Sequence, residues 1–138
     1  MPAPDHGGPM LATISNGLAR LHTQYYGKGP TRAKSYLVND MVICVLREGF
    51  TTVERTLIDD DRHEAVHQIR RTFQTAMQDR FVNVVEEATG RSVIAYMSQV
   101  HVNPDIAVEL FMLEPLQEEI VAVGEHDVGD SAAPEPET

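Results

Sequence analysis

Residues 22–34 hold the densest group of side chains that could bind a ligand or a partner in this 138-residue chain. The segment reads His-Thr-Gln-Tyr-Tyr-Gly-Lys-Gly-Pro-Thr-Arg-Ala-Lys, so three cations fall within seven residues, beside two glycines and two tyrosines. Backbone amides of a glycine turn can add donors to such cations, and together they favour an anion or an acidic partner. The candidate binding residues are Tyr25, Tyr26, Gly27, Lys28, Gly29, Arg32 and Lys34.

A simpler interpretation of these residues stays open. Gly27 is placed to end a helix, because glycine readily adopts the left-handed conformation that a helix end requires. Pro30 discourages any continuation of that helix. The basic side chains would then form only a solvated rim. The glycine spacing matches neither a Walker phosphate loop nor the GxxG loop of a KH domain.

Other residues with possible chemistry are scattered and suggest no catalytic site. His63 and His67 have ligand-like spacing on one helix face, but no third ligand is indicated nearby. The acids at 59–61 precede a helix, where they complement the positive end of its dipole. Cys44 lies in an apolar run without an activating neighbour, which indicates a core position. We therefore expect no catalytic residue, no metal site and no cofactor, and ordinary surface positions for the histidines, including His22.

Composition indicates a globular protein of one domain. Hydrophobic residues make up 42% of the chain and charged residues 23%, as in soluble proteins. The net charge of −10 comes mainly from the tail: residues 13–115 hold 13 acids and 11 bases, whereas residues 116–138 hold seven acids and no base. Such acidity counts against nucleic acid. One cysteine, no signal-peptide pattern and no long apolar run together indicate a cytoplasmic protein.

The first half of the chain predicts a helix and a hairpin. Apolar residues recur with helical spacing over residues 9–26. They are Leu11, Ile14, Leu18, Leu21 and Tyr25. Two apolar runs between residues 34 and 47, separated by Asn39 and Asp40, read as a β-hairpin. Residues 51–60 favour a short helix with a Thr51–Glu54 capping box, although their β-branched residues leave a strand open.

The second half predicts a long helix and another hairpin. The helix starts at Asp61 and ends at Gly90. Its apolar positions are Val66, Ile69, Phe73, Met77, Phe81, Val84 and Val85. Residues 92–102 and 106–113 form an apolar pair around a turn at 103–105. We expect Arg70 and Arg71 to cover the edges of this helix and to pair with Glu64, Glu86 or neighbouring acids.

These elements predict an α+β protein: a two-layer sandwich with a four-stranded antiparallel sheet and helices on one face, in the order α-β-β-α-α-β-β. Apolar side chains occupy both faces of the strands, so one sheet face is left uncovered. We expect a homodimer or higher homo-oligomer to bury it. The folded domain should cover residues 9–114, between a disordered start at 1–8 and an acidic, largely disordered tail at 115–138.

The motifs, taken in order, resemble the MpsC domain family. Besides residues 22–34, the matching segments are Leu-Arg-Glu-Gly-Phe-Thr-Thr-Val-Glu-Arg-Thr-Leu (46–57), Ile-Arg-Arg-Thr-Phe-Gln (69–74), Thr-Gly-Arg (89–91) and Asn-Pro-Asp-Ile-Ala-Val-Glu-Leu-Phe (103–111). The resemblance covers about residues 11–114. Thr52 is a departure, since relatives often carry proline there, and the acidic tail lies outside the family's pattern.

The resemblance implies a component of a cation-translocating, membrane-potential-generating system, associated with membrane proteins linked to inorganic carbon uptake. It supplies no catalytic residues. We expect a non-enzymatic accessory or regulatory subunit that binds a membrane transport protein or a small anion, and that reaches the inner face of the membrane through its partner. The alternative is a nucleic-acid-binding module that uses the basic loop 27–34 and the arginines of the long helix.

Overall fold

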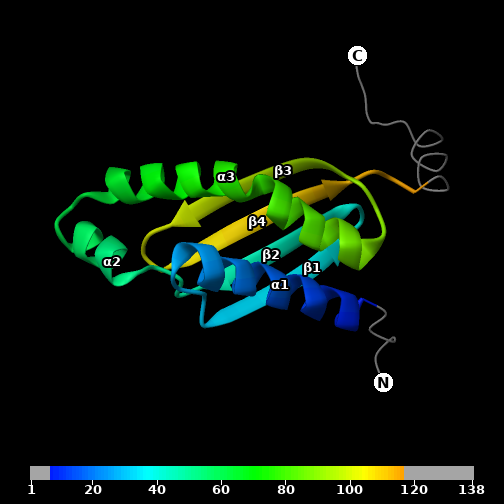
Figure 1. Cartoon of the computed structure of the whole chain (residues 1–138), viewed down its shortest axis with the longest axis horizontal. Coiled ribbons are helices and arrows are strands. Elements are labelled where there is room, and N and C mark those ends of the chain that lie inside the picture. Colours follow the sequence, from blue (N-terminus) through cyan, green and yellow to red (C-terminus); the bar gives the residue numbers. More distant parts are fainter. Residues whose placement is uncertain (1–6, 117–138) are drawn as a thin grey trace, which may run out of the picture.

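The computed structural model describes residues 7–116, in which a layer of helices covers one side of an antiparallel sheet (Figure 1). The elements are α1 (Gly8–Tyr26), β1 (Arg32–Val38), β2 (Met41–Arg47), α2 (Thr52–Asp59), α3 (His63–Thr89), β3 (Val93–His101) and β4 (Ile106–Leu113). The predicted α+β sandwich and its element order are confirmed. The expectations for residues 1–6 and 117–138 lie outside the described residues.

The sheet joins two hairpins through their second strands. Its strand order is β1-β2-β4-β3, and every neighbouring pair is antiparallel. Helix α1 packs along β1, and α3 packs along β3. The chain therefore repeats a helix–hairpin unit twice, with the short α2 inserted before the second. None of the helices within residues 7–116 is long and apolar enough to cross a membrane.

Side chains alternate strictly between the two faces of the central strands. Every second residue of β2 and β4 is buried beneath the helices, as the two-residue period of a strand requires. These inward residues are Val42, Cys44, Leu46, Ala107, Glu109, Phe111 and Leu113. Helix α1 adds Ile14 and Leu18 to this core, and α3 adds Val66, Phe81 and Val85.

The structure decides whether residues 51–60 form a helix or a strand, and it shifts the predicted starts of α3 and β1. The segment after Phe50 is a helix, because Thr51 and Glu54 form the predicted capping box at N···O distances of 3.0 and 2.8 Å. The strand alternative is wrong. Helix α3 starts at His63 because Asp61 has a φ of 59°, outside the helical region. Strand β1 starts at Arg32, two residues earlier than predicted, so the basic segment is only partly a loop.

Candidate functional site

Residues 22–34, which we call the signature segment, end α1 and turn sharply into β1. Gly27 ends the helix in the left-handed conformation, with a φ of 90°, which confirms its predicted capping role. Gly29 then folds back against the last turns of α1. A β-carbon at Gly29 would lie 2.2 Å from Thr23 Oγ1, whereas nonbonded heavy atoms approach to about 3.5 Å. The close approach of this turn to the helix therefore favours glycine, because a larger residue would displace the Thr23 hydroxyl.

Lys28 fastens this turn to the end of β2. Its Nζ donates hydrogen bonds to the carbonyl oxygens of Glu48, at 2.7 Å, and Gly29, at 3.2 Å. The Thr31 amide donates to the Arg47 carbonyl at 3.0 Å, and the Thr31 hydroxyl donates to the Glu48 carboxylate. Two of the three ammonium protons of Lys28 are thus used within the chain. The first cation of the signature stabilises a loop-to-strand contact.

A buried ion pair between Arg70 and Glu54 lies next to this turn. Arg70 Nε is 2.6 Å from Glu54 Oε2, and Arg70 Nη2 is 2.7 Å from Oε1. Nη2 also donates to the Gly49 carbonyl at 3.0 Å, and Tyr26 donates its hydroxyl to Glu54. The guanidinium carbon lies 4.3 Å from the centre of the Tyr26 ring and 5.3 Å from that of Phe50. We call these five residues the Arg70 junction.

The position of Arg70 corrects the sequence-based expectation. Arg70 is 4% exposed and does not cover a helix edge, whereas its neighbour Arg71 pairs with Glu64 at 3.2 Å on the surface, as predicted. The buried side of α3 carries Arg70 and Gln74 between Val66 and Met77. Ile69, predicted to face the core, is instead 40% exposed.

Both members of the ion pair stay charged. Burial acts to raise the pKa of Glu54, but the hydrogen bonds from Arg70, Tyr26 and the Thr51 amide outweigh it and lower the pKa. Burial acts to lower the pKa of Arg70, but Glu54 outweighs it and raises the pKa. Burial and the hydrogen bond to Glu54 raise the pKa of Tyr26, which therefore remains a neutral donor. The Arg70 junction therefore contains a charged Arg70 guanidinium and a charged Glu54 carboxylate that stabilise each other in the folded chain.

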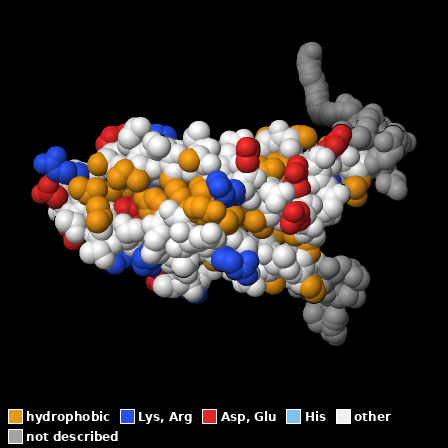
Figure 2. Space-filling model, viewed as in Figure 1, with side chains coloured by type: hydrophobic (Ala, Val, Ile, Leu, Met, Phe, Trp, Pro, Cys, Tyr) orange, Lys and Arg blue, Asp and Glu red, His pale blue; other side chains and the backbone are white. Residues whose placement is uncertain are grey.

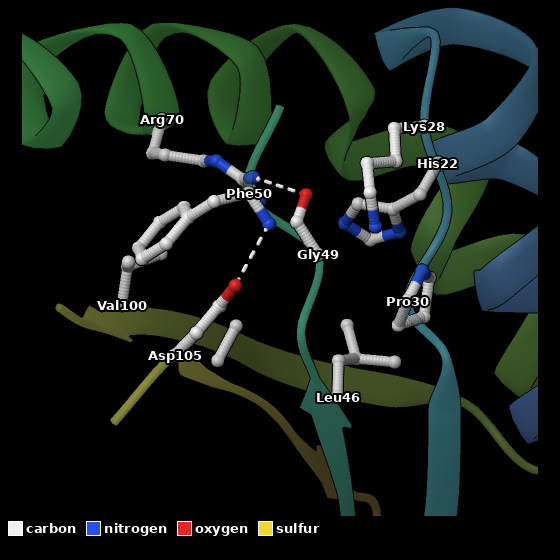
Figure 3. A pocket seen from close by; sticks show the side chains of 10 residues that line it. His22, Lys28, Pro30, Leu46, Gly49, Phe50, Arg70, Val100 and Asp105 are labelled. Carbon is white, nitrogen blue, oxygen red and sulfur yellow. Dashed lines mark hydrogen bonds between the residues drawn. The ribbon is translucent and has the colours of Figure 1, made fainter. Parts of the chain in front are cut away.

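The enclosed hollow beside the junction is small. Figure 3 shows it between Arg70, Gly49 and Asp105 on one side and His22 and Lys28 on the other. Its volume is about 10 Å³, which is about the space of a single water molecule. The carboxylate of Asp105, which lines the hollow, is held by the Phe50 amide, which donates a hydrogen bond to its Oδ2 at 3.0 Å. The hollow has no room for a metabolite.

His22 belongs to the core, so the expectation of a surface histidine is wrong for this residue. It is 3% exposed, and its ring stacks on Phe81 at a centroid distance of 5.2 Å. The Nδ1–H donates to the Leu18 carbonyl at 2.9 Å, since a carbonyl can only accept. Burial lowers the pKa of His22, so the ring is neutral at pH 7. His22 therefore packs in the core, and its ring donates a hydrogen bond to a carbonyl within α1.

The structure distributes the seven candidate residues over three places. Tyr26, Gly27, Lys28 and Gly29 build the turn and the junction described above. Tyr25 is 46% exposed near the end of α1, where the guanidinium of Arg80 on α3 lies 4.6 Å from its ring centre. Arg32 and Lys34 are exposed on β1 and alternate with Ser35, which is buried against Ser15 of α1 at 2.7 Å. They therefore lie on the sheet face opposite the helices, and the three cations do not converge.

Comparison with known families now identifies the chain. A family model described as "Na+-translocating membrane potential-generating system (MpsC)" matches residues 7–115. The chain belongs to the MpsC family. The match spans every helix and strand of the structure and confirms the resemblance seen in the sequence. The comparisons with curated proteins and with solved structures gave no match.

A buried carboxyl, Glu109, lies at the centre of the sheet of this MpsC chain and was not among the residues predicted from the sequence. Glu109 is fully buried and lies directly opposite Ser98 in β3 and Cys44 in β2. Tyr96 donates its hydroxyl to Glu109 Oε1 at 2.5 Å, while Oε2 and Ser98 Oγ have no hydrogen-bond partner within residues 7–116. Burial raises the pKa of Glu109 to about 7.

The strand pattern could have revealed Glu109. It interrupts the row of inward-facing residues at 107, 109, 111 and 113, which are otherwise apolar. A charged residue in such a row is unusual, because burying an unpaired charge is costly. Its neighbour Cys44 is also buried, as predicted, and burial raises its pKa to about 11.

Proposed function

We propose that this MpsC-family chain is a non-enzymatic accessory or regulatory subunit of a Na+-translocating, membrane-potential-generating system. It acts by binding a protein of that system at the cytoplasmic face of the membrane. The observation that carries the proposal is that Lys28 and the neighbouring Arg70 have their hydrogen-bond partners inside the chain. Lys28 holds two carbonyls, Arg70 holds Glu54 and Gly49, and the hollow between them fits one water molecule. This arrangement supports a structural role for these residues and a function that depends on binding a partner at the protein surface.

The surface that fits such a partner lies on the helical side. Figure 2 shows a band of apolar side chains along the line between α1 and α3, extending toward α2. Tyr25, Val53 and Ile69 are 46%, 65% and 40% exposed, and the guanidinium of Arg80 covers one face of the Tyr25 ring. We call these four residues the helical seam. Exposed tyrosine and arginine beside aliphatic side chains are typical of the energetically important parts of protein interfaces.

A protein partner fits the structure better than a small anion or a nucleic acid. An anion would need the signature cations to converge, whereas Lys28 binds carbonyls and Arg32 and Lys34 lie on the other face of the sheet. A nucleic acid would need arginines free for phosphates. Of the three arginines on α3, Arg70 is buried against Glu54, Arg71 pairs with Glu64 and Arg80 lies over the Tyr25 ring.

Site-specific photo-crosslinking tests the proposed contact. A photoreactive phenylalanine analogue replaces Tyr25 in the full chain, expressed in its native cells, and the crosslinked products are identified by mass spectrometry. The matched control carries the analogue at Asn83, which is exposed on α3 outside the seam. We expect position 25, and not position 83, to capture a membrane protein of the Na+-translocating system. Equal products from both positions, or none from position 25, would contradict the proposal.

A further inference from the structure

We propose that two copies of the chain pair through the sheet face that the helices leave uncovered. We call it the open face. The proposal goes beyond the proposed function, because it concerns a different surface and a different partner. The open face consists of the outward-pointing residues of all four strands. They are Arg32, Lys34, Tyr36, Val38, Met41, Ile43, Val45, Arg47, Ala95, Met97, Gln99, His101, Ile106, Val108, Leu110 and Met112.

The open face has an apolar centre and a polar rim. Its central strands, β2 and β4, present seven apolar residues and one arginine, Arg47. A sheet face that is meant for water normally carries polar residues at these positions. The edge strands supply Arg32, Lys34 and Tyr36 on one side and Gln99 and His101 on the other, while Val38, Ala95 and Met97 extend the apolar centre to the edges at the other end. An apolar centre with a polar rim is the usual composition of a protein–protein interface.

The dimensions of the open face suit a reversible dimer. Four strands spaced by about 4.8 Å and seven residues of about 3.3 Å each give a patch of roughly 19 by 23 Å. Two such patches would bury roughly 900 Å² in total, below the range of stable interfaces and within that of weak, transient ones. We therefore expect a dimer with a dissociation constant in the micromolar range, about 1–100 μM.

The charges at the two ends of the open face select a second copy as the occupant. Arg32 and Arg47 lie directly opposite each other at the end where β4 begins, with Lys34 in the next row. Glu48, also at this end, is held by Thr31.

The other end of the face carries a carboxylate. Glu114 is exposed where β4 ends, while Asp40 at the same end pairs with Arg91 at 2.7 Å. A two-fold axis in the plane of the sheet and across the strands would place the basic end of each copy over Glu114 of the other. This self-complementarity is what a two-fold symmetric interface requires.

Sedimentation analysis of the purified full chain, from 1 to 200 μM, tests this dimer directly. We expect wild type to shift from monomer to dimer over this range. Met97→Arg, at a position 53% exposed on the open face, and Leu110→Arg, at its centre, should weaken dimerisation at least tenfold. The matched control is Val53→Arg, which adds the same charge at a position 65% exposed on the helical side and should leave the dimer unchanged.

A charge exchange tests the orientation of the two copies. Arg47→Glu should weaken the dimer several-fold, and adding Glu114→Arg to the same chain should restore it. Circular dichroism of each variant checks that the fold is intact. Wild type that stays monomeric at 200 μM would overturn the proposal. So would a dimer that withstands both Met97→Arg and Leu110→Arg. Failure of the charge exchange alone would overturn the antiparallel orientation.

Discussion

The guanidinium of Arg70 lies against the carboxylate of Glu54 with both side chains buried, and the two nitrogen–oxygen distances are 2.6 and 2.7 Å. This pair joins α3 to α2, while Tyr26 and Gly49 add α1 and the loop after β2. Three helices and a loop thus meet at one ion pair. Arg70, Glu54 and Tyr26 therefore hold the helices of this chain together.

Removing one member of this pair should destabilise the fold strongly. Arg70→Met leaves the Glu54 carboxylate buried without its counter-ion, which costs about 3–5 kcal/mol. Urea unfolding followed by circular dichroism measures the loss. The control is Arg71→Met on the same helix, whose exposed pair with Glu64 contributes less than about 1 kcal/mol. Equal losses for the two variants would show that the junction is not structural.

The buried Glu109 should make stability depend on pH in a defined direction. Its pKa rises from 4.5 to about 7 on folding, so between these values the folded chain keeps a proton that the unfolded chain has lost. The contribution of Glu109 to stability is therefore full below about pH 4 and is lost as the pH rises toward 7. Glu109→Gln should remove this fall and should stabilise the protein at pH 8 by about 1–3 kcal/mol.

Thermal melts of wild type and Glu109→Gln between pH 4 and pH 8 check this prediction. The two proteins should melt at similar temperatures at pH 4, and the variant should melt higher at pH 8. Melting curves that stay parallel over the whole range would mean that Glu109 has the same pKa in the folded and unfolded chains.

Cys44 should be almost unreactive in the native protein. Burial raises its pKa from 9.0 to about 11, so the thiolate fraction at pH 8 falls about 100-fold. Reaction with a coloured disulfide reagent at pH 8 should be at least 100-fold slower in native protein than in urea, where Cys44 is exposed. Rapid modification without denaturant would contradict its position beneath the helices.

Gly29→Ala should loosen the signature turn. The added β-carbon would meet Thr23 Oγ1 at 2.2 Å and would displace the Thr23 hydroxyl from its hydrogen bond to the Ala19 carbonyl. We expect a loss of about 1 kcal/mol or more. The same substitution in a Thr23→Ala background should cost less, because the clashing oxygen is gone. Urea unfolding of the four proteins in this cycle measures the coupling.

The fold could be predicted from the sequence because the hydrophobic periodicity of the elements agreed with the residues that end helices and form turns. Gly27 and Gly90 end helices in the left-handed conformation, Asn39 occupies the hairpin turn with a φ of 54°, and Thr51 caps α2. Each of these signals acts within a few residues. The sequence could not place Arg32 on the sheet, because the start of β1 depends on the pairing of Arg32 with Arg47.

The interior of the site was harder to predict, because long-range pairs determine it. The apolar stripe favoured Ile69 as the core residue of α3, yet Arg70 is buried since Glu54, 16 residues earlier, satisfies its charge. His22 is buried because Phe81 and Phe73 surround its ring. Spacing along one helix cannot reveal partners on another. The inward position of Glu109 in β4, by contrast, can be read from a single element.

The Na+-dependent membrane potential of living cells tests the central claim most directly. A potential-sensitive dye reports the potential in cells that lack this chain and in cells complemented with wild type or with Tyr25→Asp, a change on the exposed helical seam. We predict that deletion lowers the Na+-dependent potential, that wild type restores it, and that the folded Tyr25→Asp variant does not. An unchanged Na+-dependent potential after deletion would contradict the assignment of this chain as a subunit of the system.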